Sequence, residues 1–534
     1  MGAPRALSWP KVSRSAPNKE ESPAPDRVRR GLMVGLPAVV ALAYALGHLN
    51  WYLGTPLGRV PVLDERENMD LAEAIFGGTL PALPFYRAPG YALLLAGLRL
   101  AGVPASGLFN AALMLGVVLH AAGAALAARL AQRWFGGRAA LAAGLLYALD
   151  PVLVHYATQA LDAELSLVLF LGGLNSLAAA LGDGDRIRPW ASAGLLWAAA
   201  ALVRPNFLLV WLVVPCLALA RPGPWRARAR VLAAALAGVL LFGAASAWQK
   251  GVSGTAGFLP WQGPYNLWAA NRPGANGRYY TQHVALSPEL ARGNPARAES
   301  IFLFVQETGG TPDDIPAMGA HWRRRFLGEV AHHPLRWSAL MARKAYALVN
   351  NWEQYNNKTY AFHKALSPWL RWNPIGWGVL LVLAVGGAAR LAAESPRAAF
   401  ALAAATAACA ASILLFFVSA RFRLPLAGVC AVLAGGALGD PGFWRGWPAG
   451  RRAALGACAV LAGAVAFSRI GAVADSSTFV QDHALLARAA FTVGDDATAL
   501  AEAREALKLQ PWHPDAKAVE AAARAEIARK AAAP

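Results

Sequence analysis

The chain has 534 residues, of which 56% are hydrophobic and only 15% are charged. A soluble domain carries about 25% charged residues, so the composition excludes a single water-soluble globule, and it equally excludes a disordered or collagen-like chain. The 50 Lys and Arg residues against 31 Asp and Glu residues give a net charge of +19. These values predict an all-α polytopic membrane protein.

Most of the excess positive charge lies in short stretches between apolar runs, which is the distribution that sets membrane topology. We therefore expect no nucleic-acid partner. All of the cysteines lie inside apolar runs and none has metal-type spacing (Cys216, Cys409, Cys430 and Cys458). The cysteines therefore predict no disulfide framework and no metal site.

Residues 1–30 are polar and basic, and they are predicted to form a disordered cytoplasmic tail. The run 31–53 is long enough to cross a bilayer, since a span needs about 20 residues, and we interpret it as an uncleaved first span. Further apolar runs bring the predicted total to about eleven transmembrane helices: 108–130, 139–154, 165–181, 189–203, 206–220, 231–248, 374–391, 398–418, 424–438 and 453–468.

The segment 89–103 is apolar but short, and it contains Arg99. If it crossed the membrane, the later basic connections would lie opposite the basic N-terminal tail, against the positive-inside tendency. We therefore predict an interfacial helix here. With this topology the outer loops 54–107 and 251–373, and everything after residue 470, lie on the non-cytoplasmic face.

Two further segments are predicted to be helical outside the spans. In 336–352 basic and apolar residues alternate at helical spacing, which favours a second interfacial helix or an ordinary amphipathic helix of the loop. The tail 475–534 is alanine-rich, and its residues 484–517 resemble one tetratricopeptide repeat. Because a lone repeat cannot bury its apolar face, we expect it to pack on the outer loop, on a final helix at 518–530, or on a protein partner.

Two pairs of acidic residues lie at the predicted outer edge of the membrane. Asp64 and Glu65 follow the first span at the start of a helical pattern, where the helix dipole favours negative charge. Asp162 and Glu164 lie at the mouth of a later span. Carboxylates at this depth are costly and usually face a wet cavity. One interpretation is a general base for a hydroxyl group, and the other is helix capping or plain interfacial placement.

Four arginines are predicted to lie at the same edge. Arg87 precedes a rigid Pro-Gly turn, Arg204 separates two apolar runs, and Arg421 and Arg423 lie between two spans. A guanidinium group in such a place can present a planar fork to a phosphate. Anchoring of the side chain at the membrane interface is the alternative.

No P-loop, HExxH, CxxC or GxSxG motif is present in the sequence, which argues against most ATP-driven pumps, zincins and hydrolases. An acid beside a phosphate cradle suits displacement of a phosphate leaving group from an anomeric carbon, with the arginines stabilising the departing charge. ATP is not expected outside the cytoplasm, so a lipid-borne phosphosugar is the expected donor. No cofactor is predicted, and the residues alone leave a divalent metal open.

These motifs resemble the GT-C superfamily of membrane glycosyltransferases over about residues 31–440, especially bacterial relatives of protein O-mannosyltransferases and of lipid A aminoarabinose transferases. Asp64-Glu65 matches the Asp-Glu of that family's first outer loop, which implies that Asp64 is the catalytic base. The basic residue before the turn implies that Arg87 contacts the donor phosphate. The resemblance also implies that 31–470 is a glycosyltransferase domain that works without a metal.

Two later motifs extend the resemblance. Leu161-Asp162-x-x-Leu165 matches the second acidic motif of the family, and residues 421–425 resemble a late basic motif of its bacterial members. The chain departs from the pattern where the turn reads Ala-Pro-Gly, since the mannosyltransferases usually have two prolines there. Glu164 also competes with Asp162 for the second acidic role.

The resulting hypothesis is an inverting glycosyltransferase of the bacterial inner membrane. It would move a sugar from a polyprenyl-phosphate donor to a glycan, lipid or protein acceptor on the non-cytoplasmic face. One alternative is a transporter or flippase of an anionic lipid-linked substrate, which predicts inverted repeats, and no convincing symmetry relates the two halves. Another is a membrane scaffold that recruits protein partners through its tail, which leaves the acidic motifs unexplained.

Overall fold

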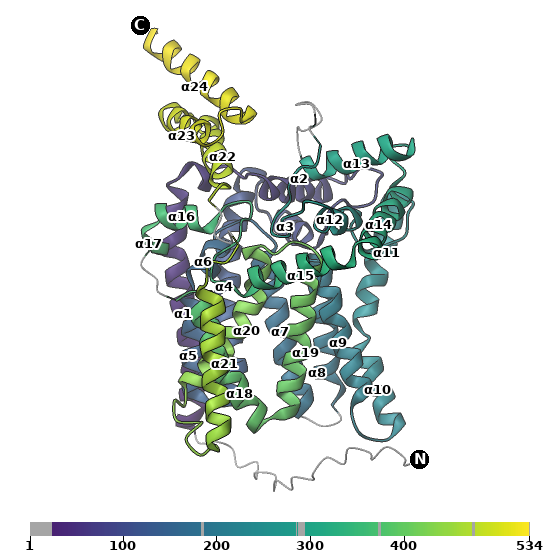
Figure 1. Cartoon of the computed structure of the whole chain (residues 1–534), viewed down its shortest axis with the longest axis vertical. Helices are drawn as coiled ribbons and strands as arrows, with labels where there is room; N and C mark the ends of the chain where they lie inside the picture. Colours follow the sequence, from purple (N-terminus) through teal and green to yellow (C-terminus); the bar gives the residue numbers. More distant parts are fainter. Residues whose placement is uncertain are drawn as a thin grey trace.

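The computed structural model describes residues 24–182, 186–284, 286, 294–371, 375–471 and 476–532. These residues form α-helices and two short 3-10 helices joined by loops, and they contain no β-strand. The predicted all-α class is therefore confirmed. The helices fall into a bundle, an outer layer at one end of the bundle, and a helical tail that projects from that layer (Figure 1).

Eight helical segments of the described chain are long and apolar enough to cross a bilayer. They are α1 (Ala24–Leu53), α4 (Leu108–Phe135), α7 (Ala163–Gly182), the pair α10 (Trp225–Ala235) and α11 (Gly238–Ser253), α18 (Trp377–Glu394), α19 (Pro396–Leu415), α20 (Ala420–Leu438) and α21 (Ala449–Phe467). The chain is thus a multi-pass membrane protein. Helix α1 already begins at Ala24, inside the segment 1–30 predicted to be a tail, and residues 1–23 lie outside the described residues.

Three of the predicted spans have a different local structure. The run 139–154 folds as α5 (Gly137–Ala148) and α6 (Pro151–Ala157), which are bent by 58° relative to each other and pass the length test only as one broken span. The runs 189–203 and 206–220 form the short apolar helices α8 (Ile187–Val203) and α9 (Phe207–Ala220). Length and composition therefore support eight or nine spans, and the predicted eleven are reached only if both short helices also cross.

The outer layer is built from the two predicted outer loops. Its helices are η1 (Pro56–Gly58), α2 (Asp64–Phe76), α3 (Gly90–Leu100), η2 (Ala105–Gly107), α12 (Gln262–Ala269), α13 (Pro295–Thr308), α14 (Ile315–His332), α15 (Pro334–Val349), α16 (Tyr360–Leu366) and α17 (Pro368–Arg371). Helix α3 corresponds to the segment 89–103 and has 11 residues, about half of what a span needs. Helix α15 corresponds to the segment 336–352, and Figure 1 shows it lying across the bundle.

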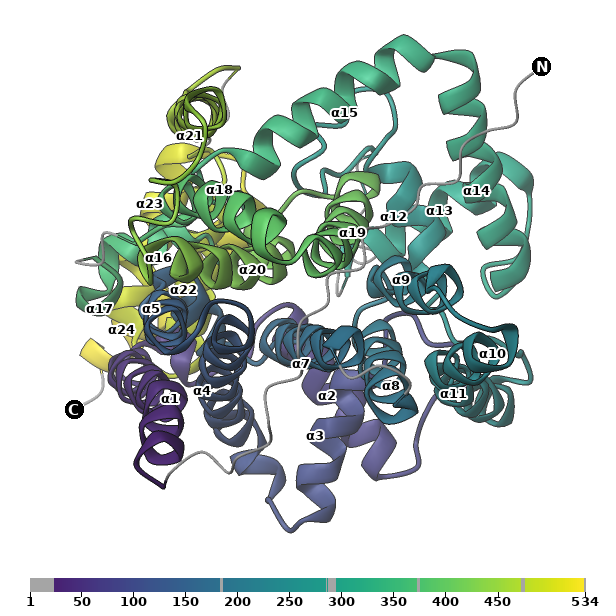
Figure 2. The ribbon, with the colours of Figure 1, turned by 90° about the horizontal axis from the view of Figure 1, so that it is seen from below.

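Small residues let the helices of the bundle approach closely. Seen from below, α18 and α20 lie against each other, and α20 also packs on α5 (Figure 2). A methyl group placed on Gly387 of α18 would come within 1.8 Å of the carbonyl oxygen of Leu433 in α20. A hydrophobic driving force is weak between helices in lipid, so close backbone packing of this kind is a main source of their association.

The tail consists of α22 (Phe479–Thr492), α23 (Asp496–Leu509) and α24 (Pro514–Ala532). Alanine side chains fill the contact among the three helices. The inner face of α22 belongs instead to the main core, through Leu485, Leu486 and Ala489. The predicted helical tail is therefore present and packs on the outer layer, while its assignment as a tetratricopeptide repeat stays a prediction.

Substitution of Gly387 by Ala is expected to loosen the contact between α18 and α20. The added methyl group meets backbone atoms that cannot rotate away, so the free energy of unfolding should fall by about 1–3 kcal/mol. The matched control is Gly456→Ala in α21, where a methyl group meets nothing within 4 Å. Unfolding titrations in detergent measure both variants, and an unchanged stability of Gly387→Ala would contradict the packing argument.

Candidate active site

Helix α2 places Asp64 at the junction of the first span and the outer layer. Its first turn carries Asp64, Glu65 and Glu67, which the positive end of the helix dipole stabilises. The preceding residue, Leu63, has a φ of 49°, and it is the single non-glycine residue with a positive φ in the described chain. Such a conformation costs about 1–3 kcal/mol and gathers at functional sites, where surrounding contacts hold it in place.

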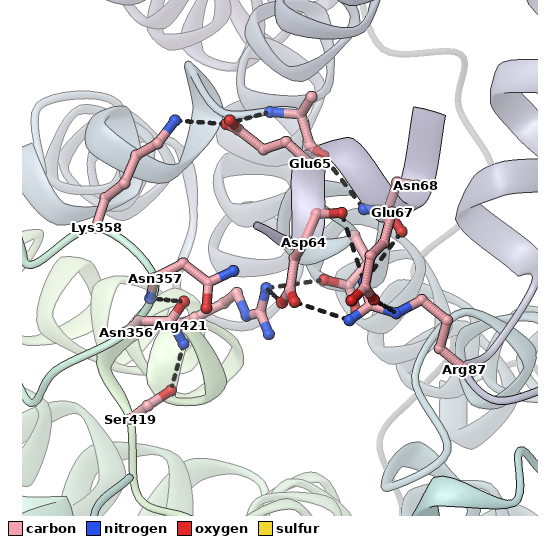
Figure 3. Close-up of polar contacts among 12 residues, drawn as sticks. Asp64, Glu65, Glu67, Asn68, Arg87, Asn356, Asn357, Lys358, Ser419 and Arg421 are labelled. Atoms are coloured by element: carbon pink, nitrogen blue, oxygen red, sulfur yellow. Dashed lines mark hydrogen bonds and ion pairs between the residues drawn. The ribbon is translucent and has the colours of Figure 1, made fainter. Parts of the chain in front are cut away.

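The carboxylate of Asp64 lies between two guanidinium groups that come from distant segments (Figure 3). Arg87 Nη2 donates to Asp64 Oδ1 at 2.7 Å, and Arg421 Nη1 donates to Asp64 Oδ2 at 2.9 Å. Burial by itself raises the pKa of Asp64, but the two guanidinium groups outweigh burial and hold this pKa well below its usual range. Asp64 is therefore an anion that is fully engaged by cations.

Asp162 extends this cluster on the side of Arg421. Arg204 binds it in a bidentate manner, with Nε and Nη2 at 3.0 and 2.9 Å from the two carboxylate oxygens. Arg421 Nη1 lies 3.8 Å from Asp162 Oδ1. Burial raises the pKa of Asp162, while Arg204 and Arg421 outweigh that effect and lower it. The structure thus brings Asp64, Asp162, Arg204 and Arg421 into one charged cluster.

Arg87 also contacts side chains that the sequence analysis did not single out. Its Nε lies 2.9 Å from Glu67 Oε2, and Asn294 Nδ2 donates to Glu67 Oε1 at 2.9 Å. Burial is the largest cause of the raised pKa of Glu67. Glu67 stands three residues after Asp64, a spacing that puts both side chains on one helix face. This spacing could have identified Glu67 as a site residue from the sequence. No pattern in the sequence indicated Asn294 as a site residue.

Glu65 points to a different partner. Lys358 Nζ lies 2.7 Å from Glu65 Oε1 and donates to the hydroxyl of Tyr52 at 2.6 Å. Both charged side chains are about 98% buried or more, with exposures of 1% and 2%. Burial lowers the pKa of Lys358, and Glu65 partly offsets this. Glu65 is thus one partner of a buried ion pair beside the site, and its predicted catalytic role stays a prediction.

Two more predicted site residues have their contacts elsewhere. Glu164 lies inside α7, where its Oε2 is 3.9 Å from Nδ1 of His120. Arg423 forms an ion pair with Glu353 and donates to the carbonyl oxygens of Leu348 and Asn350. The guanidinium groups of Arg421 and Arg423 therefore engage different sets of residues, although they are two positions apart.

A cavity of about 850 Å³ opens beside Arg87, between α2, the loop before Arg87, and α13. Glu67, Asp70, Arg87 and Arg297 supply charge at its wall, and the rest of the lining is largely apolar and aromatic. Cavities of roughly 300–1,000 Å³ hold small ligands. Among the described residues no group of three or more His, Cys, Asp or Glu side chains could hold a metal ion. The arginines at the cluster instead favour an anion.

The sequence matches no protein-family model and no curated protein. Among solved structures the chain is similar to the archaeal oligosaccharyltransferase AglB from Archaeoglobus fulgidus in complex with an inhibitory peptide and a dolichol-phosphate. The TM-score is 0.44 at 13% identity, over 83% of this chain and 55% of that one, so the chain spans about half the length of AglB.

The chain is also similar to ArnT from Cupriavidus metallidurans bound to undecaprenyl phosphate, with a TM-score of 0.31 at 16% identity, over 78% of this chain and 79% of that one. Because these scores describe distant likeness of fold, we argue function from the side chains described above.

Replacing Lys358 by Met should destabilise the protein strongly. The buried carboxylate of Glu65 then loses its counter-ion, which typically costs about 3–5 kcal/mol. The double variant Lys358→Met with Glu65→Gln removes both charges and should recover most of that loss. Unfolding titrations in detergent measure the difference, and equal stability of the single and double variants would contradict the ion pair.

Proposed function

We propose that this protein is an inverting glycosyltransferase that takes a sugar from a polyprenyl-phosphate donor, with Asp64 as general base. The observation that carries the proposal is the carboxylate of Asp64 held between Arg87 and Arg421 at the outer edge of the bundle. A base and two phosphate-binding groups therefore share one site. The adjoining cavity offers room for a sugar phosphate.

The arginines have the chemistry needed to bind a phosphate in this place. A guanidinium group binds phosphate through paired, charge-assisted hydrogen bonds. Arg421 Nε is buried and has no hydrogen-bond partner among the described residues, and an unpaired buried donor is costly. A phosphate oxygen would satisfy it. Binding of the donor phosphate would then draw Arg87 and Arg421 away from Asp64, so their hold on its pKa would weaken and its basicity would rise.

The proposed transfer is a single displacement. Asp64 accepts the proton of an acceptor hydroxyl group as that oxygen attacks the anomeric carbon. The new carbon–oxygen bond forms while the bond from the anomeric carbon to the phosphate oxygen breaks, which inverts the configuration. The bonding electrons leave with the polyprenyl phosphate, and Arg87 and Arg421 stabilise the charge that develops on it.

The remaining predicted residues take supporting roles in this proposal. Asp162 and Arg204 form the bidentate pair behind Arg421 and orient its guanidinium group. Asp162 is the better placed of the two candidates for the second acidic residue, since the contacts of Glu164 are to His120. Arg423 would reach a phosphate only if its pair with Glu353 opened, so we assign it to positioning the start of α20.

We further propose the orientation of the chain in a bacterial inner membrane. Asp64, the outer layer and the tail lie at the end of the bundle opposite the start of α1 (Figure 1). The basic connections that follow α4 and precede α10 lie at the same end as the start of α1, as expected for a cytoplasmic face. The site and the tail would then face the periplasm, where a lipid-linked donor rather than a nucleotide sugar is at hand.

Substitution of Asp64 by Asn should abolish sugar transfer. The amide cannot take a proton, and loss of a general base lowers rates by about 10²–10⁴-fold. Release of labelled sugar from a purified polyprenyl-phosphate sugar in proteoliposomes measures the rate, and Asp313→Asn, an exposed position, is the matched control. Near wild-type transfer would refute the base. Movement of intact donor across the bilayer would instead support a flippase, and a phenotype lost only with the tail would support a scaffold.

Removal of the Arg421 side chain by substitution with Ala should weaken binding of undecaprenyl phosphate. A charge-assisted hydrogen bond contributes about 1.5–3 kcal/mol, so the dissociation constant should rise by about 10–100-fold. Arg99→Ala is the control, because Arg99 contacts Glu73 and Phe76 outside the cluster. Equilibrium binding in detergent distinguishes the two. Equal affinities of the Arg421 variant and the control would remove Arg421 from the phosphate site.

A further inference from the structure

The segment of residues 353–360, here the bridging segment, supplies two side chains that reach the site from outside the predicted motifs. Asn357 lies close enough to Asp64 to help lower the pKa of its carboxyl group, and Figure 3 shows its side chain beside Arg421. The Nδ2 of Asn357 is buried and has no hydrogen-bond partner among the described residues. The next residue, Lys358, holds Glu65.

The bridging segment is also tied to the start of α20, which carries Arg421. The backbone N–H of Ala420 donates to the carbonyl oxygen of Gln354 at 3.2 Å. Asn356 Nδ2 donates to Ser419 Oγ at 3.1 Å. One short segment therefore contacts both α2 and α20, the elements that place Asp64 and one of its two cations.

The far side of the bridging segment is held by the C-terminal tail. Asp482 of α22 is 1% exposed, and its Oδ1 accepts the backbone N–H of Thr359 at 2.8 Å. His363 Nε2 lies 3.7 Å from the same oxygen. The ring of Phe362 packs on those of Phe479 and His483, at centroid distances of 5.7 and 4.8 Å.

Helix α22 holds a second segment next to the site. It packs against η1 (Pro56–Gly58), which lies a few residues before Asp64. Its inner residues are also part of the main core. A helix that begins 415 positions after Asp64 in the sequence thus fixes the backbone on both sides of the cluster.

We propose that α22 is a part of the catalytic module and that Asp482 is a positioning residue, which acts through the bridging segment to hold Asn357 and Lys358 against the Asp64 site. This inference rests on the proposed function of that site. The amide of Asn357 faces the carboxylate of Asp64 beside Arg421, and it can serve there only if its backbone is fixed. Ordering that backbone in advance removes an entropic cost from donor binding.

This assignment gives the two parts of the tail different roles. Helix α22 is buried against the outer layer, while α23 and α24 pack on it and project outward (Figure 1). A partner protein that bound the tail would therefore meet α23 and α24. Helix α22 itself belongs to the enzyme.

Hydrogen exchange of the full-length protein in detergent tests the mechanical part of the proposal. Asp482→Ala removes the acceptor of the Thr359 N–H, so exchange in residues 353–363 should become about ten-fold faster. Asp482→Asn keeps an acceptor oxygen in the same position, so its hydrogen exchange should stay close to that of the wild type. Burial raises the pKa of Asp482 to about 7, so a neutral acceptor is suited to this position. Asp515→Ala, exposed on α24, is the control. Unchanged exchange in Asp482→Ala would overturn the proposal.

A double-mutant cycle on sugar transfer tests the functional part. Asp482→Ala and Asn357→Ala should each lower kcat by about ten-fold, and the double variant should lose much less than the product of the two effects, because Asp482 acts in part through Asn357. Asp482→Asn should restore the rate. Independent effects that multiply would mean that Asp482 merely stabilises the fold, and this result, or a normal rate in Asp482→Ala, would overturn the positioning role.

The two proposals fail in different ways. If wild-type protein transfers no sugar, the proposed function is lost, while the exchange measurement still decides whether α22 holds the bridging segment. If transfer is present and depends on Asp64 but not on Asp482 or Asn357, the function stands and the positioning role fails.

Discussion

The site depends on one electrostatic constraint, a carboxylate on α2 that two other segments must satisfy together. Asp64 is only 19% exposed at the edge of an apolar bundle, where an unpaired charge would be expensive. Arg87 from the first outer loop and Arg421 from the start of α20 supply the two opposite charges. Formation of the cluster therefore fixes the outer loop against the bundle, and the same cations that stabilise the free protein are the ones a phosphate would engage.

The acidic residues around this cluster differ in how far they are exposed to solvent. Glu65 and Lys358 neutralise each other in a buried pair with almost no access to solvent. Asp64 and Asp162 have about one fifth of their side chains exposed, 19% and 22%, so they remain open to solvent. Neighbouring carboxylates with such different surroundings can have different tasks. In this protein the partly exposed pair is engaged by arginines, and the buried pair anchors α2.

The C-terminal tail shows how a segment with a composition of its own can still be built into the outer layer. Its alanine-rich helices α23 and α24 pack mainly on the tail itself. Helix α22 instead contributes leucine side chains to the main core and a buried carboxylate to the loop beside the site. A contact of this kind couples the tail to the outer layer without any contact between the tail and a substrate.

The sequence by itself determined the all-α membrane class, the positions of the apolar helices, and the motifs around Asp64, Arg87, Asp162 and Arg421, because apolar runs and isolated charges are local patterns. Tertiary structure decided which charges meet. Asp64 and Glu65 are adjacent, yet successive residues of a helix point about 100° apart, so they reach different partners. Asn294, Lys358 and Asp482 enter the site region from more than 200 positions away. No local pattern encodes such contacts, since they arise only when separate helices pack.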